Sequence, residues 1–206
     1  MKNVLIVAVF IIIVGGVYWY TQDEDSVAIS ESESEPAETM EETENVLAEP
    51  LAGIASTDMV TYHNEVEGYL AVPEGEGPFP ALVLIHEWWG LNDNIKELAK
   101  DFAEQGYVAL AVDLYEGEVA ETPDRAGELA GNVRENVDDA FANLEAATEY
   151  LASLDNVDGD QLASVGWCFG GQWAYNMAAN NMNIDASVMY YGNFSLEDDL
   201  SMMRAD

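Results

Sequence analysis

From residue 51 onward the sequence predicts an α/β domain, a sandwich of helices packed on a mainly parallel sheet. Short continuous apolar runs have the length and composition of strands that are buried on both faces. Segments with helical spacing separate these runs, and such alternation is typical of parallel sheets with helical crossovers. The runs are residues 81–85 (ALVLI), 107–112 (YVALAV), 163–167 (ASVGW) and 186–191 (ASVMYY).

The remaining elements are predicted from periodicity and from turn residues. Residues 59–62 and 68–72 read as a short hairpin that opens the domain. Apolar residues at helical spacing between 95 and 102 predict a helix that ends before Gly106. A long helix is predicted over about 132–154, and another over 172–179.

The charge of the chain excludes one class of partner. The 206 residues include 40 Asp or Glu and 6 Lys or Arg, a formal net charge of −34, which predicts no binding to nucleic acid. Eleven carboxylates lie in residues 21–50 and the other 29 in residues 51–206, so the excess is global. Such a surface resembles proteins of halophiles, where salt screens the self-repulsion; an ordinary acidic protein is the alternative.

Residues 4–20 form an unbroken apolar run that predicts a membrane anchor within residues 1–21. As a helix the run is roughly 26 Å long, just enough to cross a bilayer. Lys2 before it and three aromatic residues at its far end place the amino terminus in the cytoplasm and the domain outside. No small-residue cleavage site follows, so we expect an uncleaved single-pass anchor; a cleaved signal peptide and secretion are the alternative.

Residues 22–50 are rich in Glu, Ser and Thr and carry charge of one sign, with almost no large hydrophobic residues. Such a segment cannot bury a core, so we expect a disordered acidic linker. Because 49% of the whole chain is hydrophobic, residues 51–206 hold enough apolar material for one domain.

The motif Gly166-Trp167-Cys168-Phe169-Gly170-Gly171 lies between a predicted strand and a predicted helix. It has the form of a nucleophile elbow with cysteine in place of serine, in which glycines permit a sharp strained turn. The helix amino terminus would favour the thiolate. Cys168 is the only cysteine, so it forms no intramolecular disulfide and belongs to no Cys-rich zinc site. The alternative is a small buried cysteine beside a turn.

With this motif and three other stretches, the sequence resembles the dienelactone hydrolases of the α/β-hydrolase superfamily over residues 59–195. The other stretches are His86-Glu87-Trp88-Trp89-Gly90, Val112-Asp113-Leu114-Tyr115 and Tyr190-Tyr191-Gly192. The resemblance implies an α/β-hydrolase-type three-layer sandwich and a small-molecule ester or lactone substrate, without metal or cofactor.

The same resemblance implies roles for individual residues. Cys168 would attack the carbonyl, and the backbone N–H groups of Trp88 and Phe169 would form the oxyanion hole. Glu87 would control the protonation of the thiol. Arg125 would bind a substrate carboxylate.

Each of these residues has a structural alternative. Glu87 could be a solvated loop acid, Trp88 and Trp89 could fill the core, and Arg125 could pair with Glu121 or Glu128 at helical spacing. We do not assign a general base to His86, which ends a buried strand, or to His63, which belongs to the hairpin.

The family pattern places an acid and a histidine after the nucleophile, but no histidine follows Cys168 in the 38 residues to Asp206. We therefore expect a truncated chain that lacks the last strands of the sheet, the triad Asp and the triad His, and that has little turnover as given. Two hypotheses follow: a membrane-anchored ester or lactone hydrolase that uses Cys168, and a non-catalytic surface binding protein that keeps the fold.

Overall fold

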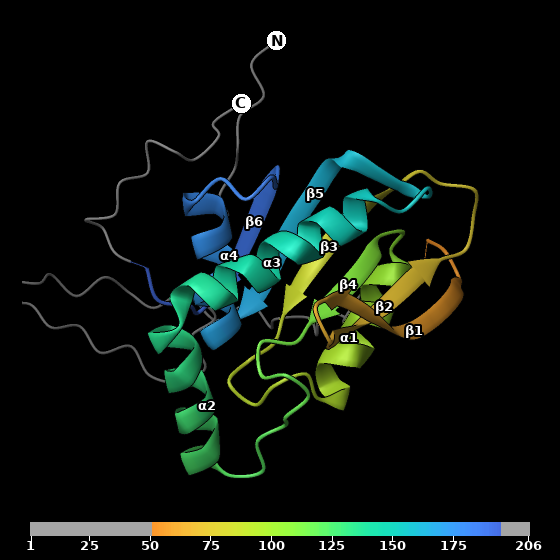
Figure 1. Cartoon of the computed structure of the whole chain (residues 1–206). Helices are drawn as coiled ribbons and strands as arrows, with labels where there is room; N and C mark the ends of the chain where they lie inside the picture. The colour runs from red at the N-terminus through yellow and green to blue at the C-terminus, as the bar shows by residue number, and fades with distance from the viewer. Residues whose placement is uncertain (1–50, 195–206) are drawn as a thin grey trace, which may run out of the picture. The chain divides into compact units, whose positions relative to one another are not determined.

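A computed structural model describes residues 51–194, in which six strands form one mixed sheet (Figure 1). The spatial order is β1-β2-β4-β3-β5-β6. The neighbours β4, β3, β5 and β6 run parallel, whereas β1 and β2 are antiparallel to each other and β2 is antiparallel to β4. The strands are β1 Ile54–His63, β2 Val66–Pro73, β3 Phe79–Ile85, β4 Val108–Val112, β5 Val157–Trp167 and β6 Ala186–Tyr190.

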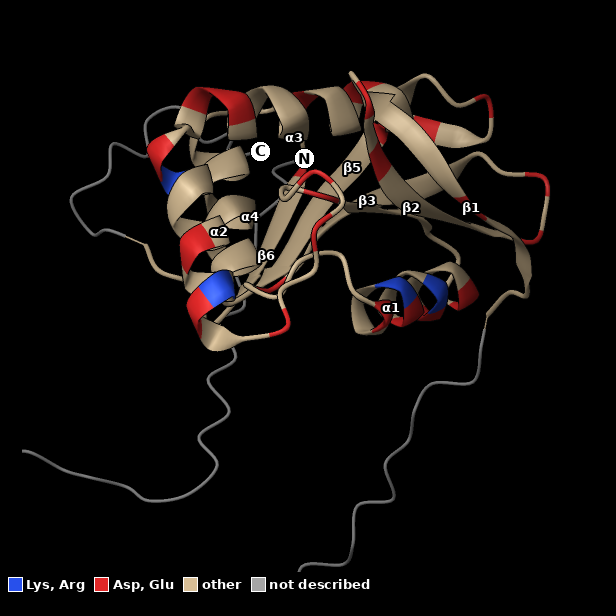
Figure 2. Cartoon of the chain, turned by 60° about the horizontal axis from the view of Figure 1, so that its bottom comes forward, with Lys and Arg blue, Asp and Glu red and all other residues tan. Residues whose placement is uncertain are grey.

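Helices cover both faces of this sheet, as the three-layer prediction requires. They are α1 Asp93–Glu104, α2 Pro123–Glu135, α3 Val137–Ala152 and α4 Phe169–Ala179. Figure 2 shows α1 on the opposite side of the sheet from α3. The expected α/β-hydrolase-type arrangement is therefore confirmed for the described residues.

The central strands are buried on both faces because their side chains alternate between two cores. In β3, Val83 and Ile85 pack with residues of α3 and α4, while Leu82 and Leu84 pack against α1. All five residues of β4 are buried. The continuous apolar runs in the sequence thus correspond to the strands that have helices on both sides.

The predicted hairpin is present, but both of its strands are longer than the sequence indicated. Asn64 takes a positive φ of 47° in the turn between β1 and β2. Strand β5 likewise begins at Val157, six residues before the predicted start.

The prediction of one long helix over residues 132–154 is wrong. Two helices, α2 and α3, meet at Asn136, whose φ of −117° and ψ of 57° are not helical. The Asn136 side-chain amide donates to the Asn132 carbonyl, which lies in the last turn of α2. The Asn136 backbone N–H donates to the same carbonyl at 3.1 Å, so the side-chain bond adds a second donor there and holds Asn136 at the break.

The predicted anchor and linker lie outside the described residues. Between residues 51 and 194, no helix combines the length and the apolar character that a membrane crossing needs.

Candidate active site

Cys168 stands at a sharp turn between the end of β5 and the start of α4. Its φ of 55° and ψ of −113° lie in a region that side-chain-bearing residues rarely occupy. The Cys168 N–H donates to the Tyr190 carbonyl at 2.9 Å, which ties the turn to the end of the neighbouring strand β6. The thiol is exposed, so the alternative of a buried cysteine does not hold.

Two glycines make this turn possible because backbone passes directly over their Cα atoms. A Cβ on Gly166 would overlap the carbonyl oxygen of Gly170, and a Cβ on Gly170 would overlap the carbonyl oxygen of Ile85. The glycines therefore let α4 start against the ends of β3 and β5 and leave the thiol on the surface.

The parallel register brings three sequence motifs together at the carboxyl ends of the parallel strands. Ile85 pairs with Gly166, and Trp167 pairs with Tyr190, so the segments after β3, β5 and β6 end at the same level. Glu87, just after β3, and Cys168, just after β5, both lie at this end of the sheet.

Tyr191 joins them, although the sequence suggested no role for it. Its hydroxyl donates to Glu87 Oε1 at 3.0 Å. Desolvation and the hydrogen bond to Glu87, together with the charges of Glu87 and Cys168, raise the pKa of Tyr191 to about 12. The phenol thus keeps its proton near neutral pH and can hold the Glu87 carboxylate.

The loop over residues 87–90 carries Trp88, one of the two expected oxyanion donors. The Tyr115 hydroxyl donates to the Trp88 carbonyl at 3.2 Å, and the Ala120 N–H donates to the Trp89 carbonyl at 2.9 Å. Within residues 51–194 the Trp88 N–H has no backbone acceptor. The other donor, the Phe169 N–H, is in the first turn of α4, where no intrahelical acceptor exists.

His86 is fully buried and supports this loop instead of facing the site. Its Nδ1 lies 2.5 Å from the Glu87 carbonyl oxygen, and its Nε2 accepts from the Leu114 N–H at 3.2 Å. Nε2 must therefore lack a proton, so the ring is neutral; burial also lowers the pKa of His86. Because both nitrogens are engaged, the ring offers no atom to a substrate proton.

Arg125 lies in the first turn of α2 and is bound by two carboxylates. Its Nε and Nη2 donate to the two oxygens of Glu118 at 2.6 and 2.7 Å, and its Nη1 donates to Glu128 at 2.8 Å. The alternative pairing with Glu128 is thus present, whereas the second partner is Glu118 in the preceding loop and not Glu121. A substrate carboxylate would have to replace Glu118.

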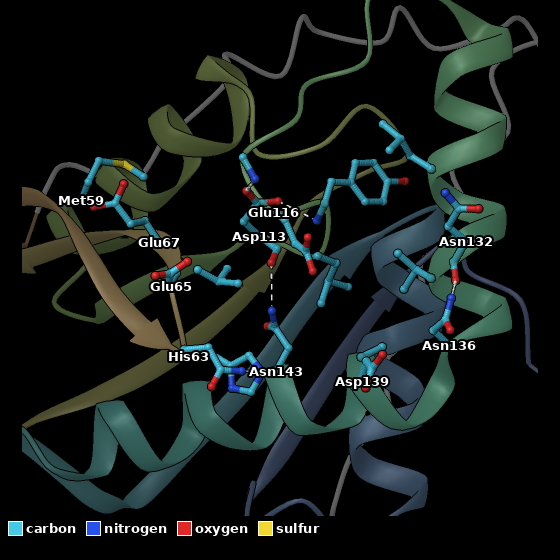
Figure 3. Close-up of a pocket in the computed structure, with 18 residues that line it drawn as sticks. Met59, His63, Glu65, Glu67, Asp113, Glu116, Asn132, Asn136, Asp139 and Asn143 are labelled. Atoms are coloured by element: carbon cyan, nitrogen blue, oxygen red, sulfur yellow. Dashed lines mark hydrogen bonds between the residues drawn. The ribbon is translucent and has the colours of Figure 1, made fainter.

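Near these loops lies a hollow of about 880 Å³ between the β1–β2 turn and the junction of α2 with α3 (Figure 3). We call it the acidic hollow, because its lining includes five carboxylates and no Lys or Arg. Tyr115 lines the hollow, and its ring also contacts Phe169, with 5.6 Å between the ring centroids. Cys168 does not line it. The carboxylates are those of Glu65, Glu67, Asp113, Glu116 and Asp139.

No group of three or more His, Cys, Asp or Glu side chains within residues 51–194 is arranged to hold a metal ion.

A strained cysteine between a parallel strand and the first turn of a helix defines a protein of the α/β-hydrolase type. The chain belongs to the dienelactone hydrolase family, whose model matches residues 66–204.

Comparisons with individual proteins agree with this assignment. The chain is 39% identical over 133 residues to the protein usf of Aquifex pyrophilus, and 36% identical over 133 residues to a candidate carboxymethylenebutenolidase of Aquifex aeolicus. Each alignment covers 62% of this chain and 57% of the relative, so the chain spans little more than half the length of these relatives.

Two solved structures show the same fold. One, named m3DLH, superposes with a TM-score of 0.65 at 29% identity and covers 72% of this chain and 64% of its own. The other is a dienelactone hydrolase-like promiscuous phosphotriesterase from metagenomic libraries, with a TM-score of 0.63 at 27% identity and coverage of 69% and 61%.

Proposed function

We propose that this protein is a hydrolase of carboxylic esters or lactones and that Cys168 is its nucleophile. The observation that carries the proposal is the backbone of Cys168, which is held at a positive φ while its thiol is exposed. Strain of this kind costs free energy and persists where a function requires it. A protein that only binds ligands would have no use for it.

The first half of the reaction follows from the residues around the thiol. Glu87 accepts the thiol proton, and Sγ attacks the carbonyl carbon, so that a C–S bond forms while the carbonyl π electrons move to oxygen. The N–H groups of Trp88 and Phe169 donate to this oxyanion. When the intermediate collapses, the C–O bond breaks and the leaving alkoxide takes the proton from Glu87. Water then hydrolyses the thioester.

Tyr191 acts in this scheme as a positioning residue for Glu87. The hydrogen bond from its phenol holds one carboxylate oxygen, which restricts the rotamer of Glu87. Tyr191→Phe would release the carboxylate and is expected to change the pH profile of acylation more than its rate at the optimum.

The test is acylation of Cys168 in the 206-residue chain by 4-nitrophenyl acetate, measured as release of nitrophenolate and as addition of one acetyl group by mass spectrometry. The same chain unfolded in urea is the control, because it presents the same thiol without the site. We expect the folded protein to acylate at least about tenfold faster. Glu87→Gln should slow acylation, and Cys168→Ala should abolish it.

Equal acylation rates for the folded and unfolded chains would contradict the proposal and favour the non-catalytic binding protein.

Arg125→Gln tests the substrate-binding role that the family resemblance implies for Arg125. If Arg125 binds substrate, this change should raise KM for carboxylate-bearing esters alone, as expected from a lost charged hydrogen bond.

For the location of the protein, we propose a single-pass anchor through residues 4–20 with the domain on the extracytoplasmic side. The support is the apolar run with Lys2 before it. The full chain should then remain with membranes after alkaline carbonate washing. A soluble form that begins between residues 21 and 30 would instead show a cleaved signal peptide and secretion.

A further inference from the structure

His86 is completely buried just after β3, and the proposed reaction gives its imidazole no proton to carry. Burying an imidazole costs free energy unless its ring nitrogens are hydrogen-bonded. Here Nε2 accepts from the Leu114 N–H at 3.2 Å, and Nδ1 lies 2.5 Å from the Glu87 carbonyl oxygen. The Leu114 N–H therefore fixes the tautomer, with the proton on Nδ1 and directed at the Glu87 carbonyl.

The Glu87 carbonyl belongs to the same peptide group as the Trp88 N–H, one of the two proposed oxyanion donors. This peptide group is planar and trans, so its C=O and its N–H point in opposite directions. A bond that fixes the direction of the carbonyl therefore also fixes the direction of the Trp88 N–H. The Gly90 N–H donates to the same carbonyl at 3.3 Å, a longer bond that restrains it less.

The imidazole also contacts the residue that carries the second oxyanion donor. Its ring stacks on that of Phe169, with 5.7 Å between the centroids and 14° between the planes. A Cβ on Gly170 would overlap the carbonyl oxygen of His86, so the backbone of His86 lies directly against the first turn of α4. One ring is thus packed on the residue of one donor and bonded to the peptide group of the other.

We propose that His86 is a positioning residue of the oxyanion hole: its Nδ1–H holds the peptide group between Glu87 and Trp88 so that the Trp88 N–H is directed at the oxyanion. This inference rests on the proposed function and goes beyond it, because it assigns a role to a side chain that never touches the substrate.

The Leu114 N–H that sets the tautomer comes from a turn built around the Asp113 carboxylate. One carboxylate oxygen accepts from the Tyr115 N–H at 2.8 Å, and the other accepts from the Gly117 N–H. Asp113 is buried, so these bonds are shielded from water. The carboxylate holds the turn that presents the Leu114 N–H, and it therefore acts on the oxyanion hole through His86.

Two reactions of Cys168 separate the oxyanion hole from the other properties of the thiol. With 4-nitrophenyl acetate, Sγ adds to a carbonyl carbon and an oxyanion forms. With iodoacetamide, Sγ displaces iodide from a saturated carbon and no oxyanion forms. Both reagents are uncharged, and both reactions depend on the thiolate and on access to it. The ratio of the acylation rate to the alkylation rate therefore reports on the oxyanion hole.

The chain has one cysteine, so mass spectrometry of the full chain reads both adducts at a single site. We expect His86→Leu to lower the ratio about tenfold, a part of the factor of about 10²–10³ that one oxyanion donor contributes. His86→Asn can still present an N–H near the position of Nδ1 and should restore most of the ratio. Asp113→Asn should lower it less than His86→Leu, because it acts one step further away.

Tyr115→Phe is the matched comparison within the same loops. Burial raises the pKa of Tyr115, so its phenol keeps the proton that it donates to the Trp88 carbonyl, which belongs to the next peptide group along the chain. This variant should lower the ratio less than His86→Leu. Ile95→Val removes one methyl group from the core around α1, on the opposite face of the sheet, and should leave the ratio unchanged although it lowers the thermal midpoint.

An unchanged ratio in His86→Leu would overturn the proposal. An equal slowing of both reagents would also overturn it, because the imidazole would then only stabilise the fold. If His86→Leu does not fold, an unchanged ratio in Asp113→Asn has the same consequence. If the unsubstituted folded chain acylates no faster than the unfolded chain, the proposed function fails and this role fails with it. If the acceleration persists in His86→Leu, the role of His86 alone is refuted.

Discussion

The turn over residues 166–171, here called the elbow, and the acidic hollow lie close together, since Tyr115 lines the hollow and contacts Phe169, but the chain builds them in different ways. In the elbow, backbone meets backbone at Gly166 and Gly170, and consecutive residues set the geometry. In the hollow, side chains from the hairpin, the loop after β4, and both α2 and α3 converge, and many of them are charged. We therefore expect that an added methyl group in the elbow strongly destabilises the fold. Substitutions in the hollow should be tolerated, and their effect on stability should depend on the salt concentration.

The largest effect should come from adding one methyl group to the elbow. Gly170→Ala places a Cβ onto the backbone carbonyls of Ile85 and His86, which cannot move without shifting β3. We expect a loss of about 3 kcal/mol or more in the free energy of unfolding, measured by urea titration at high salt.

The matched control is Gly127→Ala on α2, where nothing lies within 4 Å of the new Cβ. It should gain about 0.5–1 kcal/mol because alanine is the better helix former. Similar losses at both positions would refute the claim that the elbow is specially intolerant.

An intermediate effect is expected beneath the hollow, where Tyr62 reaches Asn143 and Asp113. The Tyr62 hydroxyl donates to Asn143 Oδ1 at 2.6 Å and lies 3.2 Å from the Asp113 N–H, which donates to it. Tyr62→Phe would leave these buried groups without a partner and should cost about 1–3 kcal/mol in unfolding free energy.

Tyr150→Phe serves as its control, because Tyr150 is a partly buried tyrosine of α3 that packs against the same core. We expect a change of at most about 0.5 kcal/mol there. A loss at position 62 no greater than at position 150 would show that the hydrogen bonds beneath the hollow do not stabilise the fold.

The smallest effect concerns the charges of the hollow. Molar salt should raise the thermal midpoint of the full chain between about 0.1 and 2 M KCl, because it screens carboxylate repulsion. The double variant Glu116→Gln, Asp139→Asn should gain about 1 kcal/mol or less at low salt and nothing at high salt.

The same charge change at Glu74 and Asp155, which lie outside the hollow, should gain less. Equal gains at the two pairs would mean that repulsion is spread over the whole surface. A midpoint of the unmodified chain that does not move with salt would remove the halophile interpretation.

The parts of the molecule that the sequence predicted are those encoded by neighbouring residues. The run ALVLI is apolar because β3 has helices on both faces, and the Gly-x-Cys-x-Gly spacing reflects a turn that needs glycine. Such signals are local, so they can be read without knowing what lies opposite in space.

The helix break at Asn136 and the ion pair of Arg125 with Glu118 depend on side-chain contacts. The spacing of apolar residues in the sequence gives no indication of such contacts. Apolar spacing continues across Asn136, while a side-chain bond to Asn132 ends the helix. Thr122 and Pro123 are the N-cap and the first residue of α2, residue types that are typical of a helix start. The helix was not predicted because few apolar residues recur at helical spacing after them. The contact of Tyr191 with Glu87 joins residues 104 positions apart in the chain, so no local pattern could signal it.

The solitary sulfhydryl of this chain also makes the elbow accessible to spectroscopy. A maleimide dye or nitroxide would attach at one atom whose backbone torsions are known and whose neighbours include the Tyr190 carbonyl. The rotational freedom of such a reporter would reveal how rigid this edge of the sheet is in solution. No background cysteine would first have to be removed.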